Sequence, residues 1–169
     1  KFLDKWCFEN NKKLKVCGRE KDALGLEKSF YKNHLCLCDW LYVPKKDNYN
    51  SYKLVDNSEL VVHIDSTLGY ESIARGKKTA TFSCRGSTLL RDSDVVSWPF
   101  GWTGDLPNNG PFWTNDQDIE EFQRVMDYIN TMSYKSWEKS LGPYSNGLME
   151  FDSGNTHLVS LLEKLLPTT

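Results

Sequence analysis

The stretch HIDSTLGYESIARGKKTATFS, residues 63–83, places small polar side chains between a predicted strand and a predicted helix. Ser66 and Thr67 are residue types that cap helix N-termini, and Gly69 lies in the first helical turn. A glycine there costs ~1 kcal/mol relative to alanine, so it indicates that something approaches the backbone closely. Two explanations fit equally well: a phosphate bound at the helix N-terminus, or tight packing of the helix against a neighbouring element.

Three charged residues extend this candidate site. Glu71 lies one turn into the helix, where a carboxylate either complements the helix dipole or accepts hydrogen bonds from ribose hydroxyls. Arg19 and Arg85 follow two other predicted strands, and arginine grips phosphate or carboxylate through two parallel hydrogen bonds. Each arginine taken alone also fits an ordinary surface position, so the case depends on both lying at one sheet edge.

Other catalytic signatures are missing from the sequence. It contains neither a Walker-type loop nor G-x-G-x-x-G, which disfavours an NTPase and a standard NAD-dependent oxidoreductase. His63 is predicted in a strand interior, and no histidine has an acidic partner suited to a Ser–His–Asp arrangement. Asp92 and Asp94 have D-x-D spacing but fall in a predicted loop, so we expect no metal site. No catalytic residue is assigned.

Composition restricts the class of protein. The chain has 169 residues, of which 39% are hydrophobic and 26% charged, values typical of one globular domain. A net charge of −2 without a long basic run disfavours nucleic acid as a partner. No apolar stretch approaches the ~20 residues that span a bilayer. The five cysteines include no C-x-x-C pair, and we predict that they are reduced and mostly buried in a cytoplasmic protein.

Alternating elements must position the candidate site. The predicted strands are 14–19, 40–43, 59–65 and 77–83, and the predicted helices between and before them are 2–13, 22–34, 52–58 and 67–75. A loop at 84–113 leads to helices at 114–132, from Ser133, and from Asn155 or Thr156 to Pro167. This order predicts an α/β fold with a Rossmann-like parallel sheet flanked by helices and right-handed crossovers. Ligands of such sheets bind at the carboxyl ends of the strands.

The segment SELVVHIDSTLGYESIARGKKTATFS, residues 58–83, resembles the nucleotide-sugar-binding half of GT-B glycosyltransferases. There a strand is followed by S-[ST]-x-G-x-E, a short helix, GK or GKP, and a further strand. The segment is most similar to bacterial surface-carbohydrate and capsule enzymes, including Kdo transferases that use CMP-Kdo. The loop PFGW…DLPNNGPFWTND also resembles such proteins, and the likeness covers approximately residues 14–140.

The resemblance implies the C-terminal half of a GT-B fold and a donor site within it. It implies that Ser66, Thr67 and Gly69 lie near the donor phosphate and Glu71 near the ribose. The turn at 18–19 occupies the place where such enzymes have a basic HP-type turn, but this sequence has GRE instead. The expected donor-binding set, with Arg85 included for its position after a strand, is therefore Gly18, Arg19, Ser66, Thr67, Gly69, Glu71 and Arg85.

The implied function is donor binding for a glycosyltransferase of bacterial surface polysaccharide or lipopolysaccharide biosynthesis. The donor would be a CMP- or UDP-linked sugar, with no other cofactor and no metal. In GT-B enzymes the acceptor, here a glycan or glycolipid, binds mainly to the N-terminal domain, which usually also carries the general base. Residues 1–169 would then be a single domain of a longer two-domain protein, inactive alone.

Several alternatives stay open at this point. A nucleotide-sugar 2-epimerase-like protein would need further carboxylates and histidines facing the site, and polyol-phosphate transferases share the outline of the motif. A non-catalytic α/β interaction module would use the strand–helix joint only for packing. The resemblance is compatible with a cytoplasmic protein whose full-length form associates peripherally with the inner face of the membrane.

Overall fold

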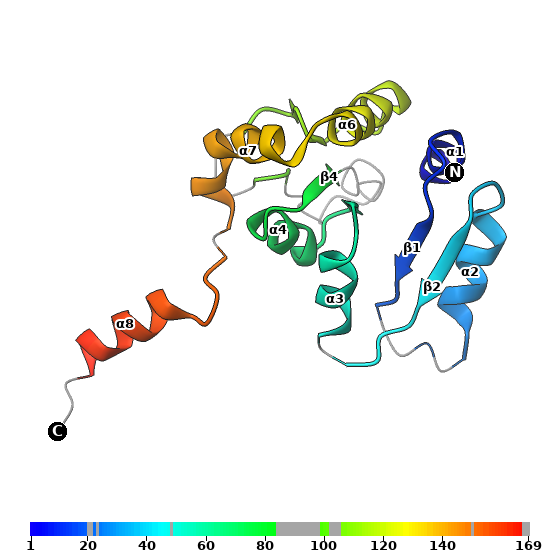
Figure 1. Ribbon diagram of the computed structural model, residues 1–169. Coiled ribbons are helices and arrows are strands. Elements are labelled where there is room, and N and C mark those ends of the chain that lie inside the picture. Colours follow the sequence, from blue (N-terminus) through cyan, green and yellow to red (C-terminus); the bar gives the residue numbers. More distant parts are fainter. Residues whose placement is uncertain are drawn as a thin grey trace, which may run out of the picture.

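The first part of the chain alternates helices and strands, as predicted. The computed structural model describes residues 1–19, 22, 24–47, 49–83, 99–101, 106–149 and 151–166. The first elements are α1 (Phe2–Glu9), β1 (Leu14–Cys17), α2 (Leu26–His34), β2 (Trp40–Val43) and α3 (Asn50–Asp56). β1 and β2 pair in parallel, with Val16 beside Tyr42. Figure 1 shows this pair with α2 packed along it.

A second sheet forms the centre of the molecule. β3 (Leu60–His63), α4 (Thr67–Ala74) and β4 (Lys78–Phe82) make a parallel strand–helix–strand unit. β6 (Trp113–Thr114) pairs in parallel with β4 and antiparallel with β5 (Asn109–Gly110), so the strand order is β3-β4-β6-β5. The prediction of a loop over 84–113 was therefore wrong at β5 and at Trp113, the first residue of β6. Burial of Phe112 and Trp113 holds this segment beside β4, and such a non-local contact leaves no short-range pattern.

Two helices cover this sheet and close the core. α6 (Ile119–Thr131) starts later than predicted, because residues after β6 form a turn that ends at the Asp118 cap. α7 (Tyr134–Leu148) begins after Ser133, as predicted, and the Ser133 hydroxyl accepts the N–H of Ser136. The core contains these buried side chains from the sheet and both helices: Ala80, Phe82, Phe112, Trp113, Val125, Met126, Ile129 and Trp137.

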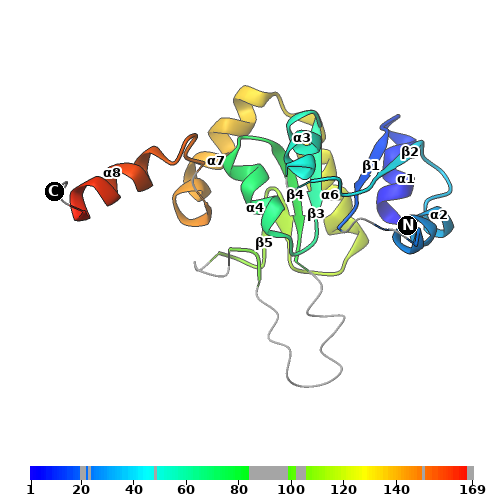
Figure 2. The same ribbon diagram turned by 90° about the horizontal axis from the view of Figure 1, so that it is seen from below.

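The two sheets are separate, whereas the sequence predicted one. Among the described strands, β1 bonds only to β2, and β3 bonds only to β4. Lys12 and Glu59, which precede β1 and β3, nevertheless form an ion pair at 2.8 Å. Figures 1 and 2 both place β1 on the β3 side of β2. The observed architecture is thus mixed α/β, with a parallel sheet and a mixed sheet flanked by helices.

The C-terminal helix stands apart from this body. α8 (Thr156–Leu165) has no buried residue, and Figures 1 and 2 show it extending away from the sheets. In the parts of the chain that the structure describes, no helix is long and apolar enough to cross a membrane.

The described cysteines are free, as predicted, but only half of them are buried. Cys7 and Cys38 are buried, whereas Cys17 and Cys36 are exposed, so the expectation of mostly buried cysteines was wrong for this set. Cys84 lies outside the described residues.

Candidate functional site

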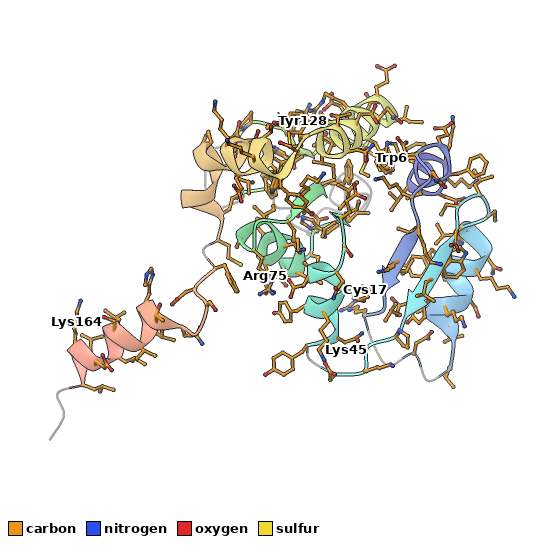
Figure 3. All side chains as sticks on the ribbon, in the orientation of Figure 1. Trp6, Cys17, Lys45, Arg75, Tyr128 and Lys164 are labelled. Carbon is orange, nitrogen blue, oxygen red and sulfur yellow. The ribbon has the colours of Figure 1, made fainter. Side chains whose placement is uncertain are left out.

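A pocket of about 160 Å³ opens beside the strand–helix joint that the sequence singled out. It lies at the carboxyl ends of the parallel strands, between α3 and α4. The residues that line it are Lys45, Ser51, Tyr52, Thr67, Leu68 and Glu71. Cys17, the last residue of β1, lies beside it with its Sγ 3.3 Å from Oγ of Ser51. Figure 3 labels Cys17 at the end of β1, Lys45 on the segment that leads into α3, and Arg75 at the end of α4.

The order of the strands explains this position. From β1 the chain crosses to β2 on one side, and it then returns past β1 to β3 and β4 on the other. In open α/β sheets the crevice between strands whose connections leave in opposite directions is the usual ligand site. Two residues of the predicted set, Thr67 and Glu71, lie in this pocket.

The lining combines an anion-binding part with hydrogen-bonding groups. Lys45 supplies a positive charge, and Thr67 is the first residue of α4, whose N-terminal N–H groups favour negative charge. Glu71 lies one turn further along α4. Hydrogen bonding to Glu71, with burial and the charge of Glu71 adding, raises the pKa of Tyr52. The pocket can therefore hold an anion at one end and hydroxyl groups beside Glu71.

The turn into α4 is held by His63 rather than by a side-chain cap. Ser66 is the N-cap residue, but its side chain makes no capping hydrogen bond. Instead, Nδ1 of His63 accepts the backbone N–H of Ser66 at 3.3 Å, and Asp65 adopts a left-handed conformation with φ 47°. The Ser66 hydroxyl is thus not occupied in capping the helix, although Ser66 is not among the lining residues.

His63 also explains Gly69. A Cβ at Gly69 would lie 2.1 Å from His63 ring atoms, so the close approach inferred from the sequence is made by the imidazole. Nε2 of His63 lies 2.7 Å from Oγ1 of Thr81, and with Nδ1 accepting from Ser66 the neutral ring donates from Nε2. Burial lowers the pKa of His63 to about 4, which keeps the ring neutral. For Gly69 the geometry favours packing, and contact with a donor phosphate stays a prediction.

The turn after β1 is occupied by internal contacts. A Cβ at Gly18 would lie 2.5 Å from the Tyr42 hydroxyl oxygen, so this glycine makes room for Tyr42. The Tyr42 hydroxyl donates to Glu27 at 2.7 Å, and the backbone N–H of Arg19 donates to the same carboxylate. Arg19 is exposed, and neither residue of this turn lines the pocket. Arg85, like the pair Asp92 and Asp94, lies outside the described residues.

Sequence reasoning missed Lys45, Ser51 and Tyr52. Lys45 could have been found, because it lies two residues beyond β2, which in the single sheet predicted from the sequence is the same edge as the turn after β3. Ser51 and Tyr52 carried no such signal, since only the packing of α3 against α4 brings them to the pocket.

Arg75 fixes that packing. Its guanidinium pairs with both carboxylate oxygens of Asp56 at 2.7 and 2.6 Å, joining the end of α4 to the end of α3. It also lies over the rings of Tyr52 and Phe151, at 5.8 and 4.6 Å from their centroids. No group of three or more His, Cys, Asp or Glu residues that could hold a metal ion occurs among the described residues.

Comparison with known proteins identifies one family. Residues 1–166 match the family described as "putative O-antigen biosynthesis protein". No curated protein and no solved structure matches the chain.

Proposed function

The chain belongs to the O-antigen biosynthesis family that it matches over residues 1–166, and on that premise we propose that it binds the donor of a glycosyltransferase. O-antigen is a surface polysaccharide, and glycosidic bonds are made from sugars activated by a nucleotide phosphate. The proposed ligand is a CMP- or UDP-linked sugar. The proposed architecture is the C-terminal half of a GT-B fold.

The observation that carries the proposal is the meeting of Lys45, Thr67 and Glu71 in one pocket at the carboxyl edge of the strands. Lys45 and the N-terminus of α4 would hold the phosphate, and Glu71 would accept hydrogen bonds from the ribose. The volume of about 160 Å³ is below the ~300 Å³ at which pockets for whole drug-sized ligands begin. We therefore assign the pocket to the phosphate and ribose, with the base and the sugar outside it.

In such a site the protein assists sugar transfer through electrostatics. Negative charge grows on the leaving phosphate as the glycosidic bond breaks, and donors already in place stabilise it without reorganising. Lys45 and the first N–H groups of α4 would supply this stabilisation, together with Thr67. No residue of this chain is assigned as general base. A glycan or glycolipid acceptor would bind elsewhere in a longer, cytoplasmic protein at the membrane surface.

Calorimetry with CMP, UDP and their sugar conjugates tests the proposal. Because hydrogen bonds to charged groups contribute about 1.5–3 kcal/mol, Lys45→Ala should weaken binding by about 10- to 100-fold. Glu71→Ala should weaken binding of ribonucleotides more than that of inorganic phosphate. Lys164→Ala is the matched control, since Lys164 is an exposed residue of the distant α8. Absence of binding, or equal affinity of all variants, would refute the donor site.

A second candidate, a non-catalytic interaction module, is favoured by α8 alone. Six apolar side chains of its segment are exposed: Leu158, Val159, Leu161, Leu162, Leu165 and Leu166. This candidate predicts no nucleotide binding, so the same calorimetry separates the two. Epimerase-like and polyol-phosphate-transferase-like activities would appear as an altered nucleotide sugar or a transferred polyol phosphate when products are analysed.

A further inference from the structure

β1 has a free edge that faces β3. The backbone N–H groups of Leu14 and Gly18 donate to carbonyls of Asp39 and Val43 on the β2 side, at 2.9 and 2.8 Å. Because the N–H groups of a strand alternate in direction, those of Lys15 and Cys17 point away from β2. No described strand pairs with that edge.

Among the described strands, none pairs with the β3 edge opposite β4, and the side chains of β3 are less buried than those of β4. Every residue of β4 is buried, but Leu60, Val61 and Val62 of β3 are only half-buried. A run of apolar residues is typical of a parallel strand that is covered on both faces. The sequence of β3 is thus suited to more burial than its side chains have in this arrangement.

Two side-chain contacts hold the unpaired edges of β1 and β3 near each other. Before the strands, Lys12 pairs with Glu59 at 2.8 Å. At the end of β1, Cys17 contacts Ser51 of α3, and Ser51 lines the same pocket as Thr67, which follows β3. The edges are therefore neighbours without being paired.

The space between the edges of β1 and β3 is called the seam below. The pocket lies at its carboxyl end and is lined by residues from both sides. Lys45 follows β2 of the smaller sheet, whereas Thr67 and Glu71 belong to α4, which packs on the larger sheet. A ligand that contacts both sides binds more tightly when the sides approach each other. Such differential affinity shifts the equilibrium toward the closer arrangement.

We propose that β1 and β3 pair directly when the pocket is occupied, joining the two sheets in the order β2-β1-β3-β4. This inference rests on the proposed function, because the donor phosphate is the group that bridges Lys45 and α4. The complete donor site then forms only when the donor is bound. Pairing with β1 also buries more of the apolar residues of β3.

Amide hydrogen exchange followed by NMR tests the pairing, with CMP as the probe and UDP as the second nucleotide. Saturating nucleotide should slow exchange at the N–H groups of Lys15 and Cys17 by at least about tenfold, because each gains a hydrogen-bonding partner. Leu14 and Val16 are internal controls, since alternation directs their N–H groups to β2 in both states. Their exchange should change less.

Two variants of Lys15 separate pairing from side-chain effects. Both variants remove the lysine side chain, but Lys15→Pro also removes the N–H that points toward β3, whereas Lys15→Ala keeps it. Proline is tolerated on an edge strand. We expect Lys15→Ala to behave as the wild type and Lys15→Pro to lose the protection of Cys17 and bind nucleotide at least about fivefold more weakly. If circular dichroism shows that Lys15→Pro does not fold, amide hydrogen exchange at Lys15 and Cys17 of the wild-type protein decides whether β1 and β3 pair.

The outcomes distinguish this inference from the proposed function. No calorimetric binding of either nucleotide refutes the donor site and the closure together. Binding with unchanged exchange at Lys15 and Cys17 refutes the closure and leaves the donor site standing.

Discussion

Replacing Gly69 by alanine tests whether the first turn of α4 is built around His63. The new Cβ would lie 2.1 Å from the ring atoms Cγ, Cδ2 and Cε1 of His63. The imidazole is buried and bonded to Thr81 and Ser66, so it cannot swing into solvent without losing both hydrogen bonds. We therefore expect Gly69→Ala to destabilise the fold, although alanine is the better helix former.

The magnitude follows from three effects. Overpacking of a well-filled site costs about 1–3 kcal/mol. Leaving a buried polar group unsatisfied costs about 1–3 kcal/mol. The higher helix propensity of alanine returns about 1 kcal/mol. The net loss should be about 1–5 kcal/mol, which for a chain of this size lowers Tm by about 2–20 °C.

Urea denaturation and thermal melts followed by circular dichroism measure this loss. Gly142→Ala in α7 is the matched control, because a Cβ there meets nothing within 4 Å. In a His63→Ala background Gly69→Ala should cost almost nothing, since the ring is gone. Unchanged or increased stability of Gly69→Ala would refute the packing argument. Normal stability combined with weaker nucleotide binding would favour contact of Gly69 with the donor phosphate instead.

Three further predictions concern stability. Burial opposes ionisation of Asp4, but hydrogen bonds from the backbone N–H groups of residues 36–38 outweigh it and lower the pKa of Asp4 to about 2. The free energy of unfolding should therefore drop by about 2 kcal/mol as the pH falls from about 4 to 2. Asp4→Asn should remove that pH dependence in urea titrations. Burial lowers the pKa of His63 from 6.5 to about 4, so on acidification the unfolded chain binds the proton before the folded one does. The contribution of His63 to stability should be complete above pH 6.5 and fall steadily as the pH drops to 4. A flat stability profile in this range would contradict a buried neutral ring. Asp118→Ala should cost about 1 kcal/mol in the same assay, because the carboxylate accepts the N–H of Glu120 at 2.8 Å, whereas an unchanged midpoint would show that the cap contributes nothing.

Most helices and strands of this protein can be predicted from its sequence. Strand 40–43 was predicted with the bounds of β2, and helix 67–75 differs from α4 by one residue. Gly76 follows α4 with φ 75°, as expected of a helix-ending glycine. Capping residues and apolar periodicity act within a few residues of each other, so one sequence suffices to find them.

Part of the candidate site was also within reach of the sequence. The edge of the sheet at which Thr67 and Glu71 lie follows from the alternation of strands and helices, because parallel strands end on one side. Family membership in O-antigen biosynthesis agrees with the resemblance to surface-carbohydrate enzymes, at that level of detail.

Tertiary structure alone decided what surrounds those residues. The sequence could not distinguish a bound phosphate from tight packing at Gly69, because both require a residue without a Cβ. Only the fold shows that the ring of His63 packs against it. Ser51 and Tyr52 reach the pocket because α3 packs on α4, and the separation of β1 from β3 depends on strands more than 40 residues apart. Such contacts are set by the summed packing of distant segments, whereas helix and strand signals are carried by neighbouring residues.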